Sequence, residues 1–231
     1  MSKRIFSFFC NVCPAILMLA ASFPAIAENK PNVVYILVDN WGWGDIGVQG
    51  STIGTPNMDA FAASGMRLTN FNVQNQCTPT RSALHTGRLP IRSGTWKVPA
   101  PGEPDGLAAW EYTLPELLSD AGYKTALFGK WHLGYEPRFN PMRHGWDEFF
   151  GYLGGNVHYF NHRETSDLHV LFRGRLPVHA EGYMTHLITD HSLAFIERHK
   201  AKPFFLYVSH ESPHFPFQGP KDAKKRVDKS N

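Results

Sequence analysis

Runs of apolar residues along this chain predict an alternation of strands and helices. The near-continuous apolar run from Asn32 to Val38 is rich in β-branched residues, which is typical of a strand buried in a parallel sheet. Similar runs predict further strands at 66–71, 123–128 and 204–208. Residue spacing and end signals predict helices at 55–64, 113–121 and 181–200. The pattern therefore predicts an α/β fold with a mostly parallel sheet.

Polar side chains follow three of these strands. Asp39 and Asn40 come directly after the first strand, Lys130 and His132 follow a later one, and His214 follows the last. In open α/β sheets, ligands gather at the carboxyl ends of the strands. Asp and Asn oxygens suit a hard cation, whereas Lys and His suit an anion, and His can also pass a proton. Each motif alone also fits a simple turn or ordinary surface chemistry.

The most distinctive stretch is 74–88, which places Cys77 at the start of a predicted helix. Pro79 suits a first helical turn, and Gly87 ends the run of helix-forming residues. Free backbone N–H groups and the helix dipole favour an anion at position 77. Arg81 lies four residues later on the same helical face, where it could clamp an oxyanion. The stretch is as consistent with an ester-hydrolase nucleophile as with a small apolar cysteine beside a surface arginine.

The N-terminus has the pattern of a secretory signal peptide. Basic residues precede an apolar run at 5–21, and Ala25-Ile26-Ala27 forms a cleavage site. We therefore expect residues 1–27 to be removed and the protein to be exported, to the periplasm or the extracellular space. The run is short and contains Pro14, so we expect no membrane anchor after cleavage.

Cysteine usage changes the interpretation of Cys77. The chain has three cysteines, and Cys10 and Cys13 leave with the predicted signal peptide. Cys77 then cannot form an intramolecular disulfide. A lone thiol in an oxidising compartment is a liability unless it is buried, paired or chemically altered.

Charge and composition exclude one class of partner. The chain has 23 Lys and Arg against 20 Asp and Glu, and loss of Lys3 and Arg4 leaves 21 basic residues. A surface so close to neutral gives no electrostatic reason to expect nucleic acid. The basic stretch at 221–229 is most simply a solvated tail. With 42% hydrophobic residues, the mature chain fits one domain with a sizeable core.

Two motifs resemble the signatures of one family. Residues 77–81 (Cys-Thr-Pro-Thr-Arg) with 86–88 (Thr-Gly-Arg) match C-x-P-x-R…T-G-R, and residues 122–132 match G-Y-x-T…G-K-W-H. Three further segments agree with them: 31–45, 144–151 and 212–216. On these motifs the chain is identified as a member of the sulfatases, within the alkaline-phosphatase-like superfamily. The resemblance runs from about residue 31 to 220 and implies a mostly parallel sheet sandwiched by helices.

The resemblance also implies cofactors. Cys77 matches the cysteine that a formylglycine-generating or equivalent maturation enzyme oxidises to formylglycine. A divalent cation, usually Ca²⁺, would be held by Asp39, Asn40 and the modified Cys77. The hydrated aldehyde would attack the sulfur of a sulfate ester, and its second hydroxyl would then allow sulfate to leave.

Four further positions match catalytic residues of the family. Arg81 would steady the formylglycine hydrate, and His132 would orient it. Lys130 and His214 would bind the sulfate and stabilise its developing charge. The substrate class implied is a sulfated small molecule or a sulfated carbohydrate. His158 and His162 could line its pocket, although aromatic packing under a loop explains them as well.

The chain departs from the family pattern in three ways. Asn40 stands where a second Asp is frequent, and Thr80 and His85 are milder differences. The sulfatase pattern also continues beyond the length of this chain, with further metal ligands. We therefore expect residues 28–231 to be the N-terminal portion of a catalytic domain, with part of the cation site and little turnover alone. A phosphodiesterase or phosphonate hydrolase of the same superfamily, and a non-catalytic remnant, remain alternatives.

Overall fold

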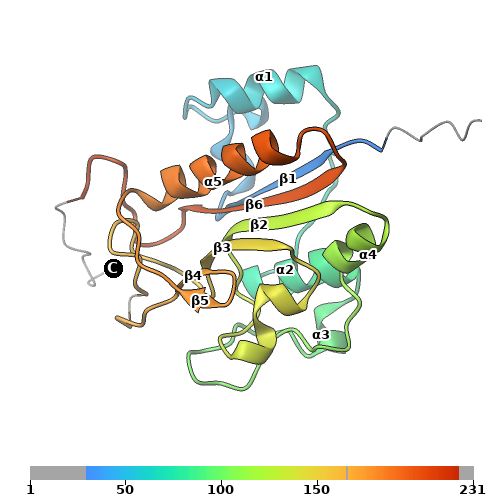
Figure 1. The fold of residues 1–231 in the computed structure, drawn as a ribbon. Helices are drawn as coiled ribbons and strands as arrows, with labels where there is room; N and C mark the ends of the chain where they lie inside the picture. Colours follow the sequence, from blue (N-terminus) through green and yellow to red (C-terminus); the bar gives the residue numbers. More distant parts are fainter. Residues whose placement is uncertain (1–29, 165, 224–231) are drawn as a thin grey trace, which may run out of the picture. The chain divides into compact units, whose positions relative to one another are not determined.

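The computed structural model describes residues 30–164 and 166–223. Residues Pro31–Asn231 form one compact unit (Figure 1). The predicted signal peptide lies outside the described residues. Within the described part of the chain, no helix is long and apolar enough to cross a membrane.

The unit is built on a six-stranded sheet in the order β1-β6-β2-β3-β4-β5. The first four strands in this order are parallel, and the last two are antiparallel to their neighbours. The strands are β1 (Val33–Asp39), β2 (Lys124–Lys130), β3 (Glu148–Tyr152), β4 (Leu171–Arg173), β5 (Leu176–Pro177) and β6 (Phe204–Pro213). The predicted α/β fold with a mostly parallel sheet is confirmed.

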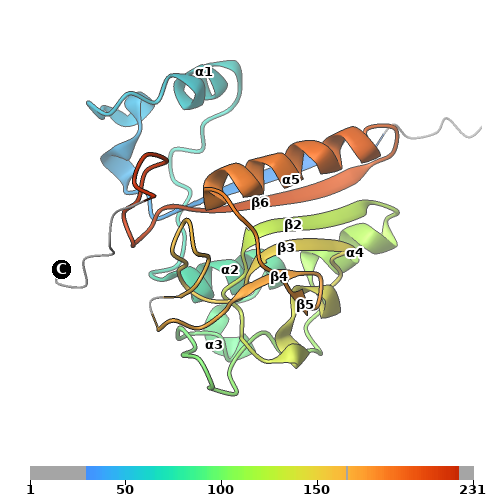
Figure 2. The same ribbon diagram turned by 60° about the vertical axis from the view of Figure 1, so that its left-hand side comes forward.

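Helices cover both faces of the sheet. Helix α5 (Met184–His199) lies along β6 and β2 on one face, while α2 (Cys77–Thr86) and α4 (Leu114–Asp120) lie on the other, as Figures 1 and 2 show. The remaining helices are α1 (Pro56–Ser64), α3 (Pro90–Ser93) and 3₁₀ turns at Trp43–Asp45, Gly47–Gln49, Pro137–Phe139 and Pro141–Arg143. The sheet is therefore sandwiched by helices.

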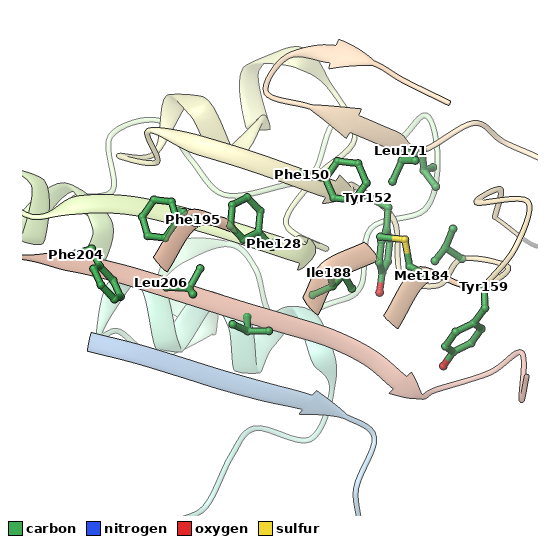
Figure 3. Packing of buried hydrophobic residues seen from close by; sticks show 14 residues of the cluster. Phe128, Phe150, Tyr152, Tyr159, Leu171, Met184, Ile188, Phe195, Phe204 and Leu206 are labelled. Carbon is green, nitrogen blue, oxygen red and sulfur yellow. The ribbon is translucent and has the colours of Figure 1, made fainter. Parts of the chain in front are cut away.

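Two hydrophobic cores lie on opposite faces of the sheet, because successive strand residues point to opposite sides. Phe128 of β2 packs toward α5, where it meets Phe195 and Ile188 (Figure 3). Its neighbour Leu127 belongs to the other core, with Trp131, Phe205 and other residues on the α2 side. The central strands are buried on both faces, which explains why their sequences are almost continuously apolar.

Thr113 and Gly87, which were predicted to begin and end helices, do so in the structure. Thr113 and Glu116 form a capping box at the start of α4, with the Thr113 side chain accepting from the Glu116 N–H. Gly87 has a positive φ of 65° and closes α2 through its N–H bond to Ala83.

One predicted strand is wrong, and one observed strand was not predicted. Residues 66–71 are not a strand: Met66 and Leu68 are 88% and 63% exposed, so the apolar residues have no sheet to cover. The aromatic segment after His144 does contain a strand, β3, whose Phe149 and Phe150 enter opposite cores. A short apolar run does not itself say which neighbours will bury it.

Candidate active site

Two strand ends and one helix bring a buried charge cluster together. Asp39 ends β1 and Lys130 ends β2, while Arg81 reaches them from α2. Asp39 Oδ2 accepts hydrogen bonds from Lys130 Nζ at 2.6 Å and from Arg81 Nη2 at 2.9 Å. The three residues are 6%, 0% and 1% exposed, respectively. Two cations thus share one carboxylate, and the cluster favours a further anion beside it.

The pKa directions follow from burial and from these charges. Burial alone would raise the pKa of Asp39, but Lys130 and Arg81 outweigh it and hold the pKa below its ordinary value. Burial, followed by repulsion from Arg81, lowers the pKa of Lys130. The Asp39 carboxylate opposes that shift and supports the charged form of Lys130.

Arg81 is fixed by residues that the sequence did not single out. Its Nη1 donates to Ser209 Oγ at 2.5 Å, to the Lys130 carbonyl at 2.9 Å and to Tyr207 Oη at 3.2 Å. Tyr207 and Ser209 are two apart on β6 and so face the same side of the sheet. In the sequence, the feature that could have identified them is a pair of polar side chains at alternating positions inside an apolar strand. Arg81 Nε is buried with no hydrogen-bond partner among the described residues, so one donor remains uncommitted.

Cys77 lies at the mouth of a cavity beside the cluster. It is the first residue of α2, with Gln76 as the extended N-cap, so the helix dipole favours negative charge there. The cavity holds about 540 Å³, and its lining includes Asp39, Asn40, Trp41, Cys77 and Arg81. The predicted proximity of the thiol, the arginine and the first strand end is therefore found in the structure.

His132 lies beside the Lys130 end of this group. It is 3% exposed, and its main-chain carbonyl accepts from Thr78 Oγ1 of α2 at 2.8 Å. Burial, then the positive charges of Lys130 and Arg81, hold the pKa of His132 well below its usual value. The imidazole is therefore neutral at ordinary pH.

His214 is held against the end of β1. Its N–H donates to the main-chain carbonyl of Asp39 at 2.8 Å, and its Nδ1 lies 2.7 Å from the Phe215 carbonyl. Burial and the charge of Lys130 lower the pKa of His214. His214 also acts electrostatically on His132, so the two histidines belong to the same site.

The donors at the end of β1 fit an oxygen-preferring cation in part. Asp39 Oδ1 makes no hydrogen bond among the described residues, and Asn40 is exposed toward the cavity. A hard cation such as Ca²⁺ takes six to eight oxygen ligands. In the described ranges, no group of three or more His, Cys, Asp or Glu residues could hold a metal ion. Asp39 and Asn40 therefore provide a fraction of a coordination shell.

The other two histidine candidates have structural roles. His158 Nδ1 accepts from the N–H groups of Phe160 and Asn161 and so stabilises a turn. His162 is 2% exposed and contacts the Gly182 carbonyl through Nε2 at 3.0 Å. Neither residue lines the cavity at Cys77.

A comparison with known families identifies the family of this chain. The family model Sulfatase matches residues 31–231. The chain belongs to the sulfatase family. Its named relatives are sulfatases, and its mostly parallel sheet with helices matches the α/β fold of solved sulfatases.

Relatives include sulfatases of several substrates. The chain is 39% identical over 230 residues to N-acetylgalactosamine-6-sulfatase of Mus musculus, covering 89% of this chain and 43% of that protein. It is 36% identical over 202 residues to arylsulfatase J of Mus musculus, and the match covers 83% of this chain and 34% of that protein. The chain thus spans less than half the length of these relatives.

Solved sulfatase structures share the fold. PsFucS1 sulfatase from Pseudoalteromonas sp. gives a TM-score of 0.72 at 34% identity, covering 83% of this chain and 46% of that one. The crystal structure of Ps i-CgsB in complex with k-i-k-neocarrahexaose gives a TM-score of 0.77 at 31% identity, and the match covers 82% of this chain and 47% of that one.

Proposed function

We propose that this sulfatase-family chain carries the nucleophile and the sulfate-binding groups for hydrolysis of a sulfate ester. The observation that carries the proposal is the buried cluster of Asp39, Arg81 and Lys130 beside Cys77. A cluster with two cations and one carboxylate suits a bound oxyanion, and the N-terminus of α2 adds to the same field.

The binding roles follow from position and charge. The positive charges of Lys130 and Arg81 attract the sulfate group. The orientation of the Arg81 guanidinium is fixed by its hydrogen bonds to Ser209 and Tyr207. His214 contributes from the end of β6. These groups lower the barrier by stabilising negative charge that develops on the sulfate oxygens and on the leaving oxygen. His132 is neutral, so its ring has one nitrogen that can accept a proton and one that can donate.

The nucleophile requires maturation of Cys77. A maturation enzyme would oxidise the thiol to formylglycine, whose hydrate offers a nucleophilic hydroxyl and a second hydroxyl that permits release of sulfate. Asp39 and Asn40 would hold Ca²⁺ against position 77 and so favour ionisation of the attacking hydroxyl. The net reaction consumes one water and yields an alcohol and sulfate.

The substrate is proposed to be an aryl or carbohydrate sulfate. Trp41 lines the cavity and is 38% exposed, so its indole offers a flat apolar face beside the anion site. Such a face suits a sugar or aryl ring. The names of the relatives agree with both classes. The predicted signal peptide at 1–27 supports the proposal that the protein is exported.

The first test is mass analysis of the tryptic peptide 68–81 from a host that carries the converting enzyme. We expect the mass change from a thiol-bearing CH₂SH to a CHO group at position 77. An unmodified thiol would overturn the formylglycine mechanism.

The second test asks which ester the converted protein prefers. We expect calcium-dependent hydrolysis of an aryl sulfate, however slow, that is lost in Cys77→Ala. Preference for a phosphate diester would instead favour the phosphodiesterase alternative within the superfamily.

A further inference from the structure

A buried carboxyl group outside the sulfatase motifs lies close to His132. Glu164 is 7% exposed and follows the glycine-rich segment after β3. Its Oε1 accepts from the Tyr135 hydroxyl at 2.5 Å and from the Gly155 N–H at 3.1 Å. Its Oε2 accepts from Ser166 Oγ at 3.3 Å.

The Gly155 contact connects Glu164 to the imidazole of His132. A Cβ atom at position 155 would lie 2.6 Å from His132 Nε2 and 2.7 Å from Cε1. The Gly155 main chain therefore packs directly against the Nε2 edge of the ring. The neighbouring position is equally tight, because a Cβ at Gly154 would lie 1.7 Å from Glu164 Oε1.

The Tyr135 contact connects Glu164 to the chain that carries His132. Tyr135 follows His132 by three residues, and burial, together with the hydrogen bond to Glu164, raises the pKa of its hydroxyl. Tyr135 therefore remains a donor at any ordinary pH.

Hydrogen bonding leaves one nitrogen of the His132 ring without a fixed direction. Its Nδ1 is buried with no hydrogen-bond partner among the described residues. Its main-chain φ is 57°, in the left-handed region that non-glycine residues seldom adopt. A single carboxyl oxygen that holds both Tyr135 and Gly155 limits the directions that the imidazole can take.

We propose that Glu164 is a positioning residue for His132, acting through Gly155 on one side and Tyr135 on the other. The use of His132 in sulfate-ester hydrolysis rests on the proposed function. The positioning itself is a property of the folded chain and can be measured without substrate.

The experiment is side-chain NMR of the ¹³C,¹⁵N-histidine-labelled chain at one fixed pH. In the wild type we expect a nuclear Overhauser contact between His132 Hε1 and the Gly155 Hα protons. Glu164→Ala should abolish this contact and shift the His132 resonances. Glu164→Gln should restore the contact in part, because its amide oxygen can still accept from Gly155 N–H.

Two further variants separate positioning from general structural damage. Tyr135→Phe should shift His132 less than Glu164→Ala, and Ser166→Ala should leave it unchanged, because Ser166 contacts only the other carboxyl oxygen. A shift confined to His132, with His85 and His191 unmoved, supports the proposal. An unchanged His132 in folded Glu164→Ala, or equal shifts at all three histidines, overturns it.

Discussion

The hydroxyl of Thr78 donates a 2.8 Å hydrogen bond to the main-chain carbonyl of His132, which lies 54 residues further along the chain. Thr78 is 1% exposed, so the carbonyl would have no water to replace this donor. We expect Thr78→Val, which preserves the branched shape, to lower the free energy of unfolding by about 1–3 kcal/mol. Urea denaturation followed by circular dichroism measures the change.

Thr80 supplies the matched control for this bond. Its hydroxyl bonds to the Gln76 carbonyl in the same helical turn, in an exposed setting where water can take over. Thr80→Val should therefore change stability much less than Thr78→Val. If both variants lost the same free energy of unfolding, the loss would come from the first turn of α2 and not from the hydrogen bond to His132.

Asp39 is the counter-charge for two buried cations, so its charge should matter for folding. We expect Asp39→Asn to cost about 3–5 kcal/mol, because Lys130 and Arg81 would then face each other without an anion between them. The measurement is the urea midpoint near neutral pH, with no added sulfate. Sulfate should restore part of the loss by occupying the anion site.

Asp105 provides the comparison for that substitution. It pairs with Lys97 at 2.7 Å on the surface, so Asp105→Asn should have little measurable effect. If Asp39→Asn were equally mild, the Asp39 charge would not be needed to stabilise Lys130 and Arg81 in the folded chain.

The sequence predicted the strand ends and the helix with Cys77 because these depend on local signals. Apolar runs, a proline in the first turn and a closing Gly87 act within a few residues. The meeting of Asp39 and Lys130 could also be predicted, because parallel strands end at the same edge of the sheet, and Arg81 lies on the helix that begins with Cys77.

The residues that support these groups were not predictable in the same way. Ser209 and Glu164 act through partners that are distant along the chain, and nothing near either residue identifies the partner. The strand order places β6 between β1 and β2, although β6 is the last strand to appear in the chain. Contacts across such a crossover depend on sheet register, which a single sequence does not specify.

Gly129 of β2 lies against the main chain of Ser209 of β6 at the active-site end of the sheet. Its φ is 114°, and a Cβ there would lie 2.0 Å from the Ser209 carbonyl oxygen. We expect Gly129→Ala to reduce stability by more than the roughly 1–3 kcal/mol of backbone strain alone, because main-chain atoms must also move. Thermal unfolding of the purified variant measures this loss.

Gly44 is the control glycine, because a Cβ there would meet nothing within 4 Å and its φ is not in the left-handed region. Gly44→Ala should leave the melting temperature almost unchanged. A stable Gly129→Ala protein would show that β2 and β6 can separate without loss of the fold.

Two buried histidines predict how stability depends on pH. The rings of His85 and His144 both pack against Trp131, and their nitrogens have no hydrogen-bond partner among the described residues. Burial and the nearby Arg81 lower the pKa of His85 to about 3, and burial lowers the pKa of His144 to about 4. Folding therefore keeps both rings neutral, whereas in the unfolded chain they take up protons near pH 6.5.

Stability should be complete above about pH 6.5 and should fall as the pH drops toward 4, on the order of 3 kcal/mol per histidine. Urea midpoints across this range measure the slope. His85→Phe should flatten it, because the ring can no longer bind a proton, whereas the exposed His179→Gln should leave it unchanged. Carboxylates also titrate near pH 4, so the decisive quantity is the difference between His85→Phe and wild type. If the urea midpoints of the two proteins fell in parallel as the pH dropped, protonation of His85 would not contribute to the loss of stability in acid.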